Sequence, residues 1–153
     1  MSNEFSKQYP FVFQDFSAQL ILFHEAIAES LGINVTDLKI AGILSRKGPL
    51  TASQLAKQTR LTGAALTKII DRLERSGFVE RKKDPKDRRA VLIHAIPEAQ
   101  TKVQQAYESF AVSMKELFSH YRPEQVQLFL EFISKTSQIL AEEAVKLKEN
   151  SYK

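Results

Sequence analysis

The residues with the clearest chemical potential are the lysines and arginines in the middle of the 153-residue chain. Residues 45–94 hold thirteen of the 22 basic side chains but only five of the 18 acidic ones, so this segment has a net charge of +8. The rest of the chain carries −4, which is why the total is only +4. A basic centre between acidic flanks is typical of a surface that binds a polyanion, although a solvated charge cluster would give the same count.

Most other kinds of chemistry lack the residues they need. The sequence has no cysteine, which excludes disulfides, thiolate metal sites and thiol-based redox sensing. Its histidines (His24, His94 and His120) are far apart and match no metal-binding repeat. No glycine-rich phosphate loop is present. We therefore expect neither an enzyme nor a protein that depends on a cofactor or a metal.

The hydropathy pattern predicts where the chain resides. No apolar run approaches the length of about 18 residues that a membrane span needs. The N-terminal residues lack the basic start and apolar core of a signal peptide. We expect a cytoplasmic protein with no membrane partner.

Two helices are predicted ahead of the basic segment. Apolar residues at steps of three and four predict a long helix over residues 10–31, with Pro10 in its first turn. Thr36 is expected to cap a short helix that ends at Ser45, because Thr is a favoured N-cap and Asp37 would lie in the first turn. The Arg-Lys-Gly-Pro sequence that follows predicts a break in the chain.

The basic segment opens with two further short helices. Thr51 and Gln54 match a capping box, which predicts a helix that ends near Thr59. Thr62 is expected to cap a second helix that runs to Ser76, with a glycine directly after it. Two short helices joined by a tight turn are typical of a helix-turn-helix, although a helical hairpin in any bundle has a similar pattern.

Two strands are predicted after the second of these helices. They span residues 78–82 and 90–95, and the polar, basic segment 83–89 forms the turn between them. A helix-turn-helix followed at once by a basic β-hairpin is a winged helix. The expected fold class is therefore mainly α with a small β-hairpin wing, in which a winged helix-turn-helix lobe lies between long N- and C-terminal helices.

The last third of the chain is again helical. Apolar residues continue at helical spacing from Pro97 to Tyr121, and Pro123 breaks the run. The final helix repeats apolar residues in heptads from Val126 to Leu147, a pattern that buries against other helices. These faces predict a homodimer, whereas packing into a monomeric bundle is the alternative.

The predicted elements divide the sequence into three parts. Residues 1–35 form an N-terminal dimerisation helix, residues 36–96 form the winged helix-turn-helix DNA-binding domain, and residues 97–153 form C-terminal dimerisation helices.

One stretch resembles the MarR family of bacterial and archaeal transcription regulators. It is LTKIIDRLERSGFVER at residues 66–81, followed by the wing sequence DPKDRR at residues 84–89. The order of the predicted elements extends this resemblance over nearly the whole chain. The resemblance implies a homodimer that binds a palindromic operator in double-stranded DNA, typically as a repressor released by a small-molecule effector of unknown identity.

The resemblance also implies which residues contact DNA. The helix that begins at Thr62 would enter the major groove and the wing arginines the minor groove. Family pattern suggests that Asp87 and Arg89 brace the wing while Arg88 projects. The family often has Ser or Thr at the position of Ala65. The DNA-binding candidates are Thr62, Gly63, Ala64, Ala65, Thr67, Lys68, Arg72, Lys86, Arg88 and Arg89.

Several assignments have alternatives in simple packing or pairing. Arg72 and Arg75 are also placed to pair with Asp71 or Glu74 along the same helix. An effector pocket is implied where the dimer helices meet the DNA-reading lobe. Its apolar candidates, with His24 as a polar group, fit the core better, so no effector-binding residue is assigned; they are Phe16, Phe23, Ile27, Ile43 and Leu44.

Two rival functions share the same predicted fold. A metal-responsive regulator would use His24 or His120 with nearby carboxylates. A winged-helix protein-interaction adaptor would not need a basic recognition helix, and it would bind no DNA even at low salt.

Overall fold

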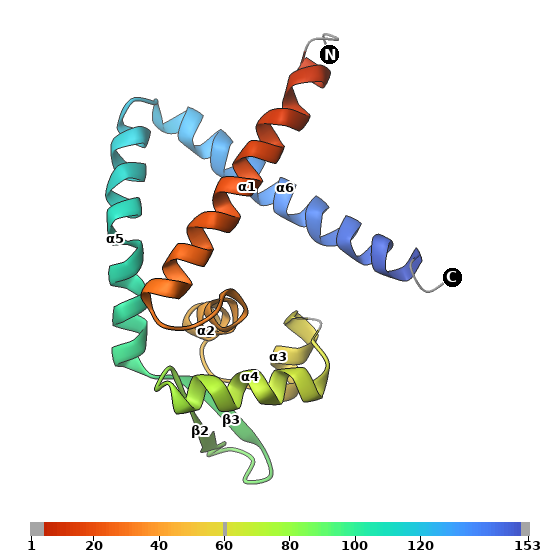
Figure 1. Ribbon diagram of the computed structural model, residues 1–153, viewed down its shortest axis with the longest axis vertical. Coiled ribbons are helices and arrows are strands. Elements are labelled where there is room, and N and C mark those ends of the chain that lie inside the picture. Colours follow the sequence, from red (N-terminus) through yellow and green to blue (C-terminus); the bar gives the residue numbers. More distant parts are fainter. Residues whose placement is uncertain (1–4, 60, 151–153) are drawn as a thin grey trace. The chain divides into compact units, whose positions relative to one another are not determined.

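The computed structural model describes the backbone of residues 5–59 and 61–150 and the side chains of residues 7–59 and 61–147. The chain divides into two compact units, Met1–Glu108 and Ser109–Lys153. Figure 1 traces the elements along the chain, which are α1 (Phe5–Ser30), α2 (Val35–Lys47), β1 (Leu50–Thr51), α3 (Ala52–Thr59), α4 (Gly63–Arg75), β2 (Val79–Lys83), β3 (Val91–Ala95), α5 (Pro97–Ser119) and α6 (Pro123–Asn150). The mainly helical fold class with a small sheet is confirmed.

The starts of the first two helices differ from the sequence-based expectation. Helix α1 begins at Phe5, so Pro10 lies inside the helix and not in its first turn. Pro10 is the sixth residue of α1 and has no N–H, so the helix lacks the backbone hydrogen bond that this position would otherwise donate. Helix α2 is capped by Asn34, whose side chain accepts a hydrogen bond of 2.9 Å from the backbone N–H of Asp37. Thr36 therefore lies within the helix, because Asn and Thr are both favoured caps and Asn34 comes first.

The two caps predicted for the helix-turn-helix are confirmed. The side chain of Gln54 accepts a 2.8 Å hydrogen bond from the backbone N–H of Thr51, and the Thr51 hydroxyl accepts one of 3.2 Å from the N–H of Gln54. At the start of α4, the hydroxyl of Thr62 accepts a 3.2 Å hydrogen bond from the N–H of Ala65. These bonds satisfy amides that a helix leaves unpaired at its N-terminus.

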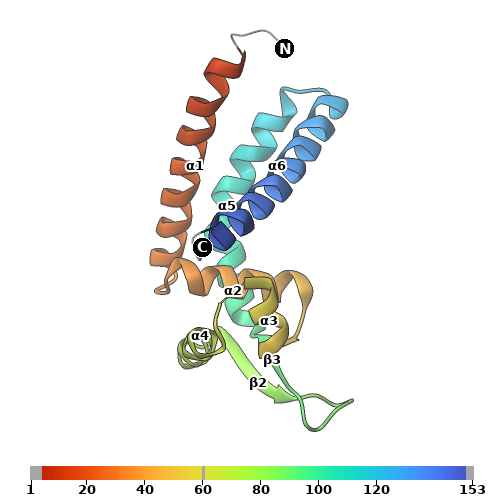
Figure 2. The ribbon, with the colours of Figure 1, turned by 90° about the vertical axis from the view of Figure 1, so that its right-hand side faces the viewer.

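The sheet has three antiparallel strands in the order β1-β3-β2. Strands β2 and β3 form the predicted hairpin, in which Val79 lies opposite Ala95 and Lys83 opposite Val91. Figure 2 shows the loop of this hairpin extending away from α4. Strand β1, which pairs Leu50 with Ile93, was missed because two residues are too short to show an alternating pattern.

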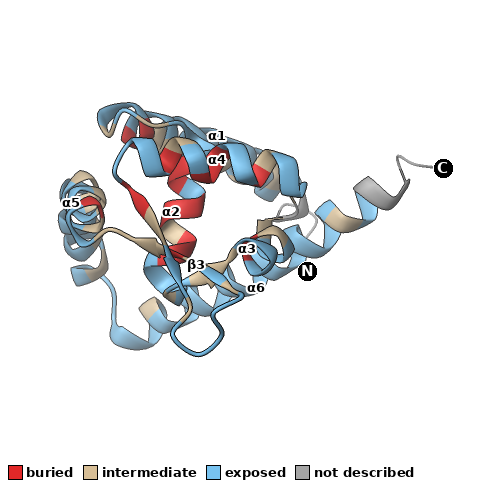
Figure 3. Cartoon of the chain, turned by 90° about the horizontal axis from the view of Figure 1, so that it is seen from below, coloured by how far each residue is buried: buried red, intermediate tan, exposed pale blue. Residues whose placement is uncertain are grey.

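The core of the first unit lies between α2, α3, α4 and the sheet. Buried residues gather on these helices in Figure 3, whereas the loop of the wing is exposed. Four apolar residues at helical spacing along α4 are all buried, and they are Leu66, Ile69, Ile70 and Leu73. Helices α1 and α5 contribute a smaller cluster, in which Ile27 and Ala28 pack with Leu38 and against Tyr107. The spacing of apolar residues along α4, at three and four positions, therefore determines which face of this helix is buried.

Two helices carry apolar faces that their own unit does not cover. In α1 the exposed residues include Phe11, Val12 and Phe16, so the expectation that Phe16 belongs to the core is wrong. The seam predicted for α6 is likewise exposed in the second unit, with Leu130 and Ile133 about half accessible. Along α1, Ile27 is buried in the small cluster, whereas Phe16, three turns earlier, is exposed. An apolar helix face of this kind is stabilised when a partner covers it.

None of the helices, over the residues that the structure describes, combines the length and the apolar character needed to cross a membrane.

Truncation of a core residue of α4 should destabilise the first unit. Leu73 is fully buried, so Leu73→Ala is expected to lower the free energy of unfolding by about 2–5 kcal/mol. Urea denaturation at fixed protein concentration measures the effect. Lys57→Ala on the exposed side of α3 is the control and should stay within about 0.5 kcal/mol of the parent. A change of similar size in both variants would contradict this placement of Leu73.

Candidate nucleic-acid interface

The N-terminal end of α4 presents backbone and small side chains. Gly63 and Ala64 are exposed, and Ala65 is half-buried. A Cβ built on Gly63 would meet no other atom within 4 Å, so nothing in the described chain requires glycine there. Helix amides that point outward favour a phosphate, and small residues let a nucleic-acid backbone approach. The hydroxyl of Thr62 is already the acceptor for the cap but can still donate one hydrogen bond.

The next turn of α4 exposes one hydroxyl and one cation. The Thr67 hydroxyl donates a 2.9 Å hydrogen bond to the backbone carbonyl of Gly63, which leaves its oxygen free to accept. Lys68 is exposed, and in the part of the chain that the structure describes it makes no ion pair. A flexible ammonium of this kind can reach either a guanine or a phosphate.

Arg72 differs from the other candidates because another helix already binds it. Its Nε donates a 2.7 Å hydrogen bond to Oδ2 of Asp37, and its Nη2 donates one of 2.5 Å to Oδ1. This bidentate pair raises the pKa of the Arg72 guanidinium, mainly through the hydrogen bonds to Asp37, while burial acts in the opposite direction. The pairing with Asp71 or Glu74 that the sequence suggested is not the one observed.

The acidic residues of α4 are held by the wing strand instead. Arg81 of β2 donates from Nη2 to Oδ1 of Asp71 at 2.5 Å and from Nη1 to Oε2 of Glu74. Its backbone N–H also donates to the Glu74 side chain at 3.2 Å. One arginine thus ties the hairpin to α4 and offsets the negative charges of Asp71 and Glu74.

Two aspartates shape the loop of the wing. Oδ1 of Asp84 accepts a 2.8 Å hydrogen bond from the backbone N–H of Lys86, and Oδ1 of Asp87 accepts one of 2.9 Å from that of Arg89. The loop is closed by a 3.0 Å bond from the Asp84 amide to the carbonyl of Ala90. Such aspartate turns fix a backbone without a regular strand or helix.

The basic side chains of this loop point outward. Lys86, Arg88 and Arg89 are all exposed, and among the described residues none of the three forms an ion pair. Asp87 therefore contributes to the wing through a backbone amide rather than through the side chain of Arg89. Lys68 thus lies on α4 and the other three cations lie in the loop between β2 and β3, all of them exposed.

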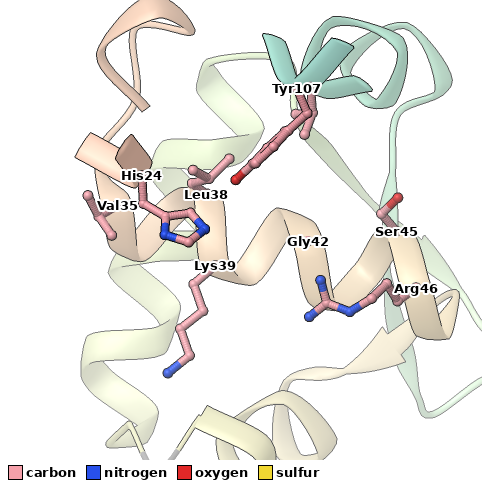
Figure 4. A pocket seen from close by; sticks show the side chains of 9 residues that line it. His24, Val35, Leu38, Lys39, Gly42, Ser45, Arg46 and Tyr107 are labelled. Atoms are coloured by element: carbon pink, nitrogen blue, oxygen red, sulfur yellow. The ribbon is translucent and has the colours of Figure 1, made fainter. Parts of the chain in front are cut away.

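A cavity lies in the first unit beside helix α2, with a volume of about 410 Å³. It is lined by His24, Val35, Leu38, Lys39, Gly42, Ser45, Arg46, Val103 and Tyr107. This volume lies within the range of about 300–1,000 Å³ that is usual for small-molecule sites. Among the described residues that line the cavity none is acidic, whereas Lys39 and Arg46 supply two cations. Figure 4 shows that both extend from α2, while the Tyr107 hydroxyl points toward Leu38.

Tyr107, an aromatic residue that lines this cavity, has a hydroxyl that stays protonated. Burial raises the pKa of Tyr107, although the positive charge of Arg46 acts in the opposite direction, so the hydroxyl remains a hydrogen-bond donor at neutral pH. The Tyr107 ring packs edge-on against Phe23 with centroids 5.7 Å apart, and it lies 6.3 Å from the ring of His24. Among the expected apolar candidates, Ile27, Ile43 and Leu44 belong to the core and do not line the cavity.

Sequence reasoning missed several residues of these two sites. Lys39 and Arg46 are seven residues apart and so share a helix face, a signal that was present in the sequence. Asp37 and Arg81 had no comparable signal, because their partners lie 35 and up to ten residues away. Among the described residues, no group of three or more His, Asp or Glu side chains is arranged to hold a metal ion.

The fold and this surface together define a winged helix-turn-helix protein. The MarR family model matches residues 27–91. The uncharacterized HTH-type transcriptional regulator YcgE of Bacillus subtilis is 36% identical over 147 residues, which cover 96% of each chain. The chain therefore belongs to the MarR family, and it is a transcriptional regulator rather than an enzyme.

Solved structures agree with this fold. A MarR family protein from Bacillus stearothermophilus has a TM-score of 0.73 and 19% identity, with 92% of this chain and 99% of that chain covered. A mutant of MepR from S. aureus, bound to an oligodeoxyribonucleotide, has a TM-score of 0.62 and 21% identity, with coverage of 87% and 98%. At these identities the likeness establishes the winged-helix fold alone.

A methyl group at Gly63 should separate folding from DNA binding. Because the site of the new Cβ is open and alanine favours a helix, Gly63→Ala is expected to keep or raise the free energy of unfolding, by up to about 1 kcal/mol. The same variant should weaken the retardation of DNA in a gel, since the methyl would stand between helix and phosphate. Gly77→Ala provides the contrast, because φ at Gly77 is +72° and alanine there should cost about 1–2 kcal/mol. Full DNA binding by Gly63→Ala would remove Gly63 from the interface.

Proposed function

We propose that the chain binds a palindromic operator in double-stranded DNA as a homodimer. The observation that carries this proposal is the set of exposed cations on α4 and the wing that form no ion pair among the described residues, which includes Lys68, Lys86, Arg88 and Arg89. DNA presents about one negative charge per 1.7 Å of helix axis, so such cations release bound counterions on contact. The MepR mutant, a protein with the same fold, is bound to an oligodeoxyribonucleotide, which supports DNA as the partner of this chain.

In this proposal α4 and the loop of the wing contact different grooves of the DNA. The N-terminal turns of α4, from Thr62 to Lys68, enter the major groove, where small residues and an exposed lysine reach base edges and phosphates. Ala65 can contact a thymine methyl group. Arg88 at the tip of the wing enters the minor groove, where the potential is most negative, and Lys86 and Arg89 lie against phosphates. Residues 36–96 serve as this DNA-binding domain in the cytoplasm.

The exposed apolar faces support the homodimer. Phe16 on α1 and Ile133 on α6 are both more than half exposed, which a lone chain in water does not favour. We assign residues 1–35 and 97–153 to dimerisation, with a second copy of this chain as the partner. A two-fold dimer presents two copies of α4 and therefore reads two inverted half-sites, which is why the operator is expected to be palindromic.

Genomic footprinting with the purified protein tests this function directly. Fragments that carry an inverted repeat should be protected, and the protein should elute from a sizing column as a dimer. If the protein retards no DNA at low salt, it is a protein-interaction adaptor with a winged-helix fold. If binding requires added zinc, it is the metal-responsive variant.

Removal of one wing arginine should change the salt dependence of binding. Arg88→Ala is expected to weaken operator binding and to reduce the slope of log K against log salt by about one, because one phosphate or groove contact is lost. Titrations across a salt series measure both quantities. Lys135→Ala removes the same charge from a lysine paired with Glu131 on α6 and should leave the slope unchanged. An unaltered slope in Arg88→Ala would argue against its place in the interface.

The cavity beside α2 supports a repressor that a small molecule releases. Part of its lining is apolar, and Lys39, Arg46 and the neutral hydroxyl of Tyr107 can each donate a hydrogen bond to an acceptor. This combination favours a small effector that joins an apolar or aromatic body to a carboxylate. Because α2 also packs against α4 through the core, an effector held there would alter the placement of the two recognition helices in the dimer and weaken operator affinity.

Charge in the effector should matter more than its shape. Benzoate is expected to weaken operator retardation at concentrations where benzamide, which is nearly the same size but neutral, has little effect. Arg46→Met should remove this difference while DNA binding without ligand stays unchanged. Equal effects of the two compounds on the parent protein would show that the cations of the cavity do not select an anion.

A further inference from the structure

Arg72 lies next to the proposed DNA-reading residues but is already engaged. It follows Lys68 by four residues, so the two side chains leave neighbouring turns of α4 on the same side. Unlike Lys68, Arg72 uses Nε and Nη2 for Asp37 of α2, at 2.7 and 2.5 Å. Both nitrogens of one edge of the guanidinium are therefore occupied by a single carboxylate, and this edge is not available to a base or a phosphate.

The carboxylate that holds Arg72 is itself fixed. The side chain of Asp37 is only 1% exposed, and its two oxygens accept from Arg72 and from no other residue that the structure describes. Its backbone N–H donates a 2.9 Å hydrogen bond to the side chain of the cap residue Asn34, so Asp37 is held in the first turn of α2. A buried carboxylate needs its partner, because an unpaired charge in the interior is costly. Asp37 thus keeps Arg72 in one conformation.

The remaining contacts of α4 with the core are less directional. Leu66, Ile70 and Leu73 are buried among other apolar residues, and such packing tolerates a small rotation of the helix better than a pair of linear hydrogen bonds does. The planar fork of an arginine on a carboxylate adds geometric specificity that apolar contact lacks. This ion pair is the one bond between charged groups that joins α2 to α4 among the described residues.

We propose that Arg72 is a positioning residue for DNA recognition, not a residue that contacts DNA. The Asp37–Arg72 pair fixes the rotation of α4 about its axis, and this rotation sets where Thr67 and Lys68 meet the major groove. The inference rests on the proposed function of α4 as the recognition helix. It differs from the sequence-based assignment, which counted Arg72 among the residues that bind DNA directly.

The test compares a specific with a nonspecific duplex across a salt series. The specific probe is the duplex that the wild-type protein enriches from a random-sequence library, and the nonspecific probe is poly(dI-dC). Four variants are measured: Asp37→Asn, Arg72→Gln, Arg72→Lys and the double variant Asp37→Asn/Arg72→Gln. Circular dichroism in the near ultraviolet at the assay temperature reports whether each variant keeps its tertiary packing.

If the pair positions α4, each single variant loses about tenfold or more in affinity for the enriched duplex and little for poly(dI-dC). The double variant then binds no worse than the weaker single variant, because both changes remove the same interaction. Arg72→Lys loses as much as Arg72→Gln, since lysine keeps the charge but not the fork. The salt slope stays at the wild-type value in all four variants, which a direct phosphate contact would not allow.

A direct contact of Arg72 with DNA predicts other results. Arg72→Gln would then reduce the salt slope by about one and weaken both duplexes, whereas Asp37→Asn would free the arginine and leave binding equal or stronger. That outcome overturns the inference, as does wild-type binding by all variants. Equal losses on both duplexes in proportion to lost near-ultraviolet signal would assign the pair to folding alone and would also overturn it.

Two controls complete the design. Arg75→Gln removes the same charge from α4 at an exposed residue that does not touch Asp37, and it should preserve the ratio of the two affinities. Should Asp37→Asn unfold at the assay temperature, Arg72→Lys decides alone: loss of the specific duplex supports positioning, and retention overturns it. Failure of the wild-type protein to enrich any duplex would instead overturn the proposed function, and the inference with it.

Discussion

The burial of one face of helix α4 is the constraint on which the rest of the first unit depends. Leu66, Ile69, Ile70 and Leu73 pack against α2, α3 and the sheet, and this packing fixes which side of α4 faces outward. The exposed side then carries small residues at its start and Lys68 one turn later. Helical periodicity alone therefore separates the face of α4 that packs on the core from the face that is exposed to a partner.

Ion pairs then determine which charges remain for a partner. Asp71 and Glu74 would make the outer face of α4 less basic, but Arg81 of the wing strand offsets both. Arg72 is bound by the buried Asp37, whereas Lys68 and the basic residues of the wing loop have no acidic partner among the described residues. The net positive charge of the segment is therefore distributed unevenly. Some cations hold the lobe together, and others are left on the surface.

Helix α2 connects the two candidate sites of the first unit. Lys39 and Arg46 of α2 line the cavity, and Asp37, two residues before Lys39, binds Arg72 of α4. Its apolar residues, including Ile40 and Leu44, belong to the same core as α4. A change in the position of α2 would therefore move α4 as well, because the two helices share one apolar core and are joined by the Asp37–Arg72 ion pair.

The sequence by itself determined the order of helices, the two caps at Thr51 and Thr62, the hairpin, and the concentration of basic residues in the segment 45–94. These features depend on local periodicity and on residues three or four positions apart, which a single chain displays directly. Only the tertiary structure decided that Arg72 binds Asp37, that Arg81 bridges the acids of α4, and that Phe16 is exposed. The two arginines bind partners on other elements, seven to 35 residues away in the sequence, and no pattern within one helix or strand specifies which charged side chain folding brings to which partner.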